Sequence, residues 1–164
     1  MFTRSVAAVT AIGRGAPLSH GAARVKRRAP VAHSAAMSEQ APEDEIYARI
    51  GEEGFARLVA AFYRRVSDDD ILGPMYPRHD MVGAEDRLRD FLVGRFGGPQ
   101  RYIAQRGHPR LRARHMPFKL DQRARDRWVA LMDAALTEVQ LEPGSAATLR
   151  GFFGDTASFL MNSR

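Results

Sequence analysis

QRGHPRLRARHMPF, residues 105–118, is the segment of this 164-residue chain on which the interpretation of its fold depends. It contains two histidines, His108 and His115, among four arginines, and it has no acidic residue. The segment lies within a longer stretch, residues 97–120, that is rich in Gly, Pro and Arg. A connection of this length is unusual inside a compact domain unless it has a function. We therefore expect the chemistry of the chain to lie there.

Upstream of this stretch, the spacing of apolar residues predicts two helices. The first covers about residues 52–67. Its buried face is expected to consist of Phe55, Leu58, Val59, Phe62 and Val66. The second covers about residues 83–95, and Gly97-Gly98-Pro99 ends it.

Downstream, the pattern predicts two more helices. Asp121 is a candidate N-cap for a third helix, which Pro143-Gly144 is expected to break. A fourth helix is expected over about residues 145–162. Because the alternation typical of strands occurs nowhere in the sequence, the predicted fold class is all-α.

The composition excludes several classes of site. The chain has no cysteine, so a disulfide framework, thiolate metal sites and a cysteine nucleophile are excluded. Any metal must therefore be held by His, Asp or Glu. Every apolar run is far shorter than the roughly 20 residues that cross a bilayer, so no membrane partner is expected.

The net charge of +6 comes entirely from one end of the chain. Residues 1–37 contain six basic and no acidic side chains, whereas residues 38–164 contain nineteen of each. A nucleic-acid-binding domain concentrates positive charge on its folded part, so no nucleic-acid partner is expected. Residues 1–40 are interpreted as a disordered basic extension and residues 41–164 as the folded domain. A transit peptide, or an over-extended reading frame with the true start at Met37, remain alternatives for the extension.

Four helices and an Arg-rich loop with two histidines could hold a planar cofactor. Haem iron needs one axial imidazole and an otherwise apolar slot. A single histidine near a helix is more often structural, so residue chemistry alone leaves both interpretations open.

Residues 105–118 resemble the haem-ligating segment of the truncated haemoglobins, specifically the second group of that family. The resemblance covers about residues 45–162. It extends to Phe62-Tyr63, Met75-Tyr76-Pro77, Gly83-Ala84-Glu85, Gly97-Gly98-Pro99 and Arg125-Asp126-Arg127-Trp128. It implies a truncated globin-like two-over-two helical sandwich that binds haem b, with His115 as the fifth iron ligand and the sixth position open.

On the distal side, the resemblance places Tyr63, Tyr76 and Trp128 around the ligand. Their phenol O–H and indole N–H groups are hydrogen-bond donors, although Tyr and Trp also fill protein cores. The usual distal His or Gln is replaced by Ala84, and Leu88 one turn later is also apolar.

The haem propionates call for cations, and the resemblance and the charges point to Arg87 and Arg114, with Tyr102 as a weaker third contact. His108 is expected to structure the loop rather than to bind iron. Apolar residues expected to form the pocket wall or ordinary core are Leu88, Phe91, Leu92, Phe118 and Met132.

The function implied is reversible binding of dioxygen, with nitric oxide and carbon monoxide as further ligands and an unidentified reductase as partner. The expected protein is cytoplasmic and either a monomer or a homodimer. One alternative is a redox enzyme that uses the same haem for nitric oxide dioxygenation or peroxide reduction. A second alternative is a haem-free helical interaction domain.

Overall fold

The computed structural model describes residues 40–76 and 78–163, and the expectations about residues 1–39 lie outside this range. Within the described residues, all regular structure is helical, as predicted. None of these helices is both long enough and apolar enough to cross a membrane. The α-helices are α1 (Ile46–Ser67), α2 (Met81–Arg95), α3 (Arg101–Arg106), α4 (Leu111–His115), α5 (Gln122–Val139) and α6 (Pro143–Leu160). The single-turn 3-10 helices are η1 (Glu43–Glu45), η2 (Gly73–Met75) and η3 (Arg78–Asp80).

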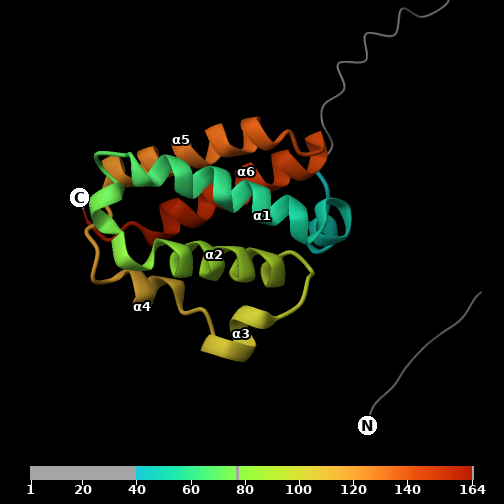
Figure 1. Cartoon of the computed structure of the whole chain (residues 1–164), viewed down its shortest axis with the longest axis horizontal. Helices are drawn as coiled ribbons and strands as arrows, with labels where there is room; N and C mark the ends of the chain where they lie inside the picture. Colours follow the sequence, from blue (N-terminus) through green and yellow to red (C-terminus); the bar gives the residue numbers. More distant parts are fainter. Residues whose placement is uncertain (1–39, 77, 164) are drawn as a thin grey trace, which may run out of the picture. The chain divides into compact units, whose positions relative to one another are not determined.

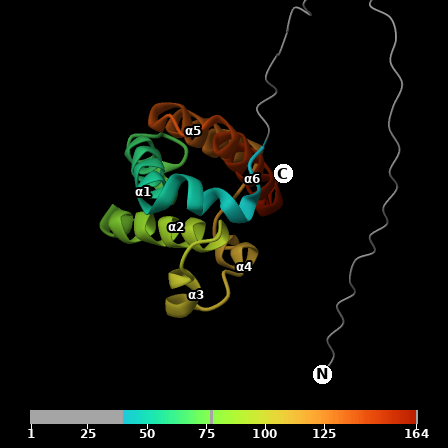
Figure 2. The ribbon, with the colours of Figure 1, turned by 90° about the vertical axis from the view of Figure 1, so that its right-hand side faces the viewer.

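The four long helices form two layers. Helix α1 packs against α2 in its own layer and against α5 in the other, where α5 packs against α6 (Figure 1). The view turned by 90° shows α3 on the side of α2 that faces away from α1 (Figure 2). This arrangement is the predicted two-over-two sandwich.

The core lies between the layers and is built largely on α1. All five residues predicted for the buried face of this helix are fully buried. Burying side chains of this size contributes about 1.5–3 kcal/mol each, so the α1 stripe is the main anchor of the fold. The buried residues of α1 pack against side chains from the other three long helices and against Phe96, which directly follows α2. The helix side chains are Leu92, Met132, Leu136, Leu149 and Phe153.

Helix α1 begins at Ile46, six residues before the predicted start, and it is kinked at Gly51. Gly51 has φ 65° and ψ −178°, a conformation that interrupts the helix and that residues with a Cβ rarely adopt. The short helical piece before Gly51 buries Ile46 completely. The predicted start near residue 52 therefore corresponds to the part of α1 that follows the kink.

The fourth predicted helix, α6, begins at Pro143 rather than near residue 145. The Asp121 carboxylate caps α5 by accepting a hydrogen bond from the Ala124 N–H (3.0 Å), as predicted. Helix α5 ends at Val139 because Gln140 is left-handed, with φ 49°. Pro143 then begins α6 instead of only breaking α5, since the first position of a helix needs no N–H donor.

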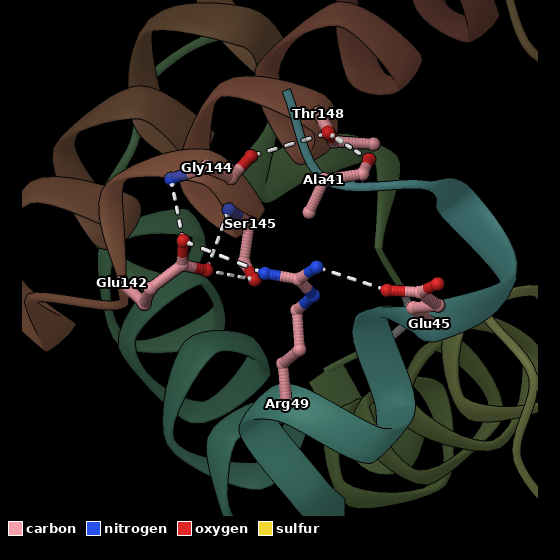
Figure 3. A network of polar contacts seen from close by, with 7 residues as sticks. All are labelled: Ala41, Glu45, Arg49, Glu142, Gly144, Ser145 and Thr148. Carbon is pink, nitrogen blue, oxygen red and sulfur yellow. Dashed lines mark hydrogen bonds and ion pairs between the residues drawn. The ribbon is translucent and has the colours of Figure 1, made fainter. Parts of the chain in front are cut away.

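A polar network ties the start of α6 to the segment before α1 (Figure 3). The Glu142 carboxylate accepts hydrogen bonds from the Gly144 N–H (3.0 Å) and the Ser145 N–H (2.9 Å), which caps α6. The buried Thr148 hydroxyl donates to the Ala41 carbonyl (2.6 Å). Arg49 of α1 lies between Glu142 and Glu45 and pairs with both. These contacts join the N-terminal end of the described chain to the first turns of α6.

Substitution of Gly97 by alanine is expected to destabilise the fold strongly. Gly97 has φ 95°, and a Cβ built there would overlap the Asp44 carbonyl oxygen, which is rigid backbone. The positive φ alone costs about 1–3 kcal/mol for a residue with a Cβ, and the overlap adds to this cost. Chemical denaturation of the Gly97→Ala protein measures the loss.

Gly51→Ala is the matched control, because Gly51 also has a positive φ but a Cβ there meets no atom within 4 Å. The Gly97→Ala protein should lose more free energy of unfolding than the Gly51→Ala protein. Equal losses would show that the contact with Asp44 does not constrain this turn.

Candidate functional site

A cavity of about 450 Å³ opens between the helices, within the usual size range of cofactor pockets. Side chains from all six α-helices contribute to its lining. All eleven site residues expected from the sequence are among them. These are Tyr63, Tyr76, Ala84, Arg87, Leu88, Phe91, Tyr102, Arg114, His115, Phe118 and Trp128.

His115 is the last residue of α4 and is half-buried at the cavity. Its Nδ1 lies 2.7 Å from the Leu111 carbonyl oxygen, one turn earlier in the same helix. A carbonyl oxygen can only accept, so Nδ1 carries the proton in this contact and Nε2 keeps its lone pair. A histidine held in this way presents Nε2 as a metal ligand, with its ring orientation fixed.

Short-range contacts hold the loop that carries α4. His108 Nδ1 accepts a hydrogen bond from the Arg110 N–H (3.2 Å), and Arg110 is left-handed with φ 41°. The Arg114 guanidinium donates to the carbonyls of Pro109 (2.9 Å) and Arg106 (3.1 Å). His108 thus has the loop-structuring contact expected for it. Residues 97–120, expected to be a loop, contain the two short helices α3 and α4.

Three aromatic donors lie together at the cavity, each from a different part of the chain. Tyr63 of α1 is 6% exposed, and its ring meets the ring of Tyr76 edge-on at 5.7 Å. Trp128 of α5 packs between Phe62 (5.2 Å) and Phe153 (5.7 Å). The packing fixes the rings, so their polar ends are held in place rather than free to rotate into solvent.

Burial raises the pKa of both phenols. The pKa of Tyr63 lies well above the ordinary value of 10.0, and that of Tyr76 is also raised. An interaction with the Trp128 side chain lowers the pKa of Tyr76 and offsets part of this effect. A phenol is already protonated near neutral pH, so the shift extends into alkaline pH the range in which both residues can donate a hydrogen bond.

The raised tyrosine pKa values predict a loss of stability at alkaline pH. Above about pH 10 the unfolded chain releases the Tyr63 proton whereas the folded chain keeps it, so the free energy of unfolding falls as pH rises. The expected slope is about 1.4 kcal/mol per pH unit for each such tyrosine. Denaturant unfolding at several pH values above 10 should show a shallower slope for Tyr63→Phe. An unchanged slope would contradict the assignment.

The cations predicted for the propionates already have partners. Arg87 forms a 2.7 Å ion pair with Asp80 and thereby lowers the pKa of that carboxyl group. The Arg114 guanidinium lies over the Tyr102 ring at 5.9 Å. Arg106 also lines the cavity and was missed in the sequence, where it is one arginine among several.

The cavity wall is apolar in the main. Phe91 packs edge-on against Tyr102 at 5.8 Å, and Ala84 and Leu88 face the same space from α2. Met132 does not line the cavity and belongs to the buried core, which settles the choice left open for it. The last turns of α6 contribute Thr156, Ala157 and Leu160, and helical spacing in the sequence places Thr156 and Leu160 on one face of this helix.

Comparison with known proteins decides the family. The family described as bacterial-like globin matches residues 45–162 of this chain. The chain belongs to this family.

The globin is similar to several characterised relatives. It is 37% identical to the group 2 truncated hemoglobin YjbI of Bacillus subtilis (strain 168), with 71% of this chain and 87% of the relative covered. The crystal structure of hemoglobin from Chloroflexus aurantiacus matches it with a TM-score of 0.70 and 40% identity, covering 74% of this chain and 99% of the other. The structure of a truncated oxygen-avid haemoglobin from Bacillus subtilis matches with a TM-score of 0.69 and 37% identity, covering 71% and 98%. The protein is a haem-binding truncated haemoglobin.

The residues of this globin fit a haem. The cavity has the size of a cofactor site and an apolar wall, and it contains one imidazole whose second nitrogen is already hydrogen-bonded. These are the features that an axial ligand and a planar porphyrin require.

Asp69 joins two parts of the globin that line the cavity, and its contacts were not evident in the sequence. Its side chain is 6% exposed and accepts hydrogen bonds from the N–H groups of Ile71 (3.0 Å) and Leu72 (2.8 Å). It also pairs with Arg127 of α5 at 3.2 Å. Asp69 therefore joins the loop leading to Tyr76 to the helix that carries Trp128. In the sequence it was only one of several residues ending the first helix.

Proposed function

We propose that this globin binds haem b through Nε2 of His115 and reversibly binds dioxygen at the opposite axial position. One observation carries the proposal. A single cavity brings together an imidazole with its Nδ1 engaged by Leu111 and the three donors Tyr63, Tyr76 and Trp128. The similarity to the truncated oxygen-avid haemoglobin from Bacillus subtilis supports this ligand.

The haem, when bound, supplies an iron that can take up a diatomic ligand. The residues of the chain would orient the imidazole, exclude water and stabilise the bound ligand. The Leu111 carbonyl orients His115, and the apolar wall excludes water from the site. Ala84 leaves space where a larger distal residue would stand. The buried Tyr63 and the half-buried Tyr76 and Trp128 would donate hydrogen bonds to a ligand that carries partial negative charge, so release should be slow.

For the propionates, we propose contacts with Arg87, Arg114 and Arg106, with Tyr102 beside them. Arg87 of α2 and Arg114 of α4 are charged groups on the cavity lining. Their present partners, Asp80 and backbone carbonyls, can share these multi-donor guanidinium groups. Leu88, Phe91 and Phe118 would contact the porphyrin faces.

We also propose a cytoplasmic location and a reductase that keeps the iron ferrous, with nitric oxide and carbon monoxide as further ligands. The redox alternative uses the same cavity, and the similarity to haemoglobins favours ligand binding over it.

Reconstituted protein tests the proposal. The ferrous form should show a five-coordinate spectrum and should bind dioxygen and carbon monoxide reversibly. Mixing the oxygenated protein with nitric oxide in a stopped-flow instrument, with a reductant present, measures turnover. Sluggish turnover supports a binding protein, whereas rapid sustained turnover would establish the redox alternative.

A further inference from the structure

The charges of the described chain are separated along its length. Residues 97–120, here called the basic segment, carry six basic and no acidic side chains. The remaining described residues, 40–76, 78–96 and 121–163, carry twelve basic and eighteen acidic side chains. The basic segment is therefore positively charged, whereas the remaining described residues together carry a net negative charge.

Three of these cations are available to a partner. Within the described chain, Arg101 is the only one of the six that forms ion pairs, with Glu52 and Asp90. The other five are exposed, and two of them, Arg106 and Arg114, are the residues proposed above for the propionates. Arg110, Arg112 and Lys119 do not line the cavity and keep their charge for a partner when the haem is bound.

Exposed apolar side chains lie among these cations. The basic segment contributes Ile103 (47% exposed), Met116 (62%) and Phe118 (40%). Phe159 of α6 is 57% exposed and lies under the Arg112 guanidinium at 5.5 Å. These are four of the five large apolar residues that are exposed in the described chain. Apolar and aromatic groups with arginine around them are typical of protein interfaces.

The same segment forms one side of the cavity. The residues it contributes to the lining are Tyr102, Arg106, Leu111, Arg114, His115, Phe118 and Leu120. A partner bound to the basic segment would therefore lie next to the imidazole and the cavity mouth.

We propose that the basic segment is the docking surface for a small acidic protein that donates single electrons to the iron. The proposal rests on the proposed function, since it needs a haem at His115. One electron leaves the donor, which is oxidised, and the ferric iron accepts it and becomes ferrous, with no bond made or broken. The electron donor is the reductase class that a reversible oxygen carrier needs after its iron is oxidised.

A small protein fits this surface better than an extended polyanion does. Charges separated by more than about 8 Å are largely screened at physiological salt, so a compact partner interacts mainly with the basic segment. A nucleic acid or a membrane surface extends further and would also approach the eighteen acidic residues outside the segment.

The test uses reduced flavodoxin, a small acidic flavoprotein, as the probe. Its binding to the full-length haem-loaded protein is measured by calorimetry at about 20 mM and about 200 mM salt. In the double variant Arg112→Glu/Lys119→Glu, neither changed residue lines the cavity. We expect its affinity at low salt to fall by about tenfold or more and its salt dependence to weaken.

The matched control is Arg57→Glu/Arg150→Glu, which makes the same change of charge outside the basic segment. Its affinity should change much less. The basic residues among 1–37 are present in every variant, so their contribution cancels. Equal losses in the two double variants, or no binding of flavodoxin to the unmodified protein at low salt, would overturn the proposal. So would tighter binding to anionic lipid vesicles that the Arg112→Glu/Lys119→Glu change abolishes.

Failure of the docking proposal can be told apart from failure of the haem assignment. The Soret spectrum and the carbon monoxide complex are recorded for each variant before the binding measurement. Normal spectra with no dependence on the basic segment would reject the docking surface alone. The rate of iron reduction by flavodoxin, compared with that by a small inorganic reductant, should fall in parallel with the affinity.

Discussion

The His115→Ala protein is expected to lose stable haem binding. The proposed bond to iron comes from this one imidazole, and the cavity holds no second histidine among the described lining residues. Loss of a contact that only orients a metal ligand costs about 10–100-fold in affinity, so loss of the ligand should cost more. Haem affinity is measured from the Soret band during reconstitution and from transfer of haem to an acceptor globin.

Two controls separate loss of the ligand from loss of the fold. His108→Ala removes a histidine from the same loop, and it should keep the haem because His108 accepts a hydrogen bond from the Arg110 N–H and is not among the described residues that line the cavity. Free imidazole added to His115→Ala should restore a haem spectrum in the space that the side chain left. A His115→Ala protein with a normal five-coordinate ferrous spectrum and unchanged haem affinity would refute the assignment.

Removing the distal donors is expected to accelerate dioxygen release. A hydrogen bond to a charged partner is worth about 1.5–3 kcal/mol, so Tyr63→Phe and Trp128→Phe should each raise the off-rate by about 10–100-fold. The rings remain packed against their neighbours in both variants, because phenylalanine keeps the aromatic contacts. Stopped-flow displacement of dioxygen measures the rate, and the haem content should be unchanged.

Tyr102→Phe is the matched control for these variants. It removes the same hydroxyl group from the same cavity, but Tyr102 lies on α3 beside Arg114, on the side of the imidazole. Its off-rate should change by less than about threefold, since a hydroxyl away from the ligand contributes nothing to that hydrogen bond. If Tyr102→Phe accelerates release as much as Tyr63→Phe does, the assignment of Tyr63 to the distal side is wrong.

The sequence predicted the elements that depend on periodicity. The α1 stripe was found because five apolar residues at helical spacing require one buried face, and the structure buries all of them. The start of α1 was missed because Gly51 interrupts the pattern, and the start of α6 because Pro143 was interpreted as a helix breaker. In both cases the deciding information is local backbone geometry, which hydrophobic spacing does not contain.

The sequence predicted which residues line the cavity better than it predicted their contacts. The eleven residues taken from the resemblance all line one cavity, yet their ligand and propionate roles stay predictions. The pairings of Arg87 with Asp80 and of Asp69 with Arg127 were not predicted, because they join residues from different elements. The same holds for Asp90, whose side chain is only 13% exposed where it pairs with Arg101. Such pairings follow from tertiary packing alone.

Helix α4, which carries the proposed iron ligand His115, has only five residues. A helix of this length has no stability of its own in water, so contacts with α6 and the cofactor must hold it. In protein that has not yet received its cofactor, we expect this turn to open first and to be the first point of cleavage by cellular proteases. The supply of iron porphyrin would then set how much of the protein accumulates in the cell.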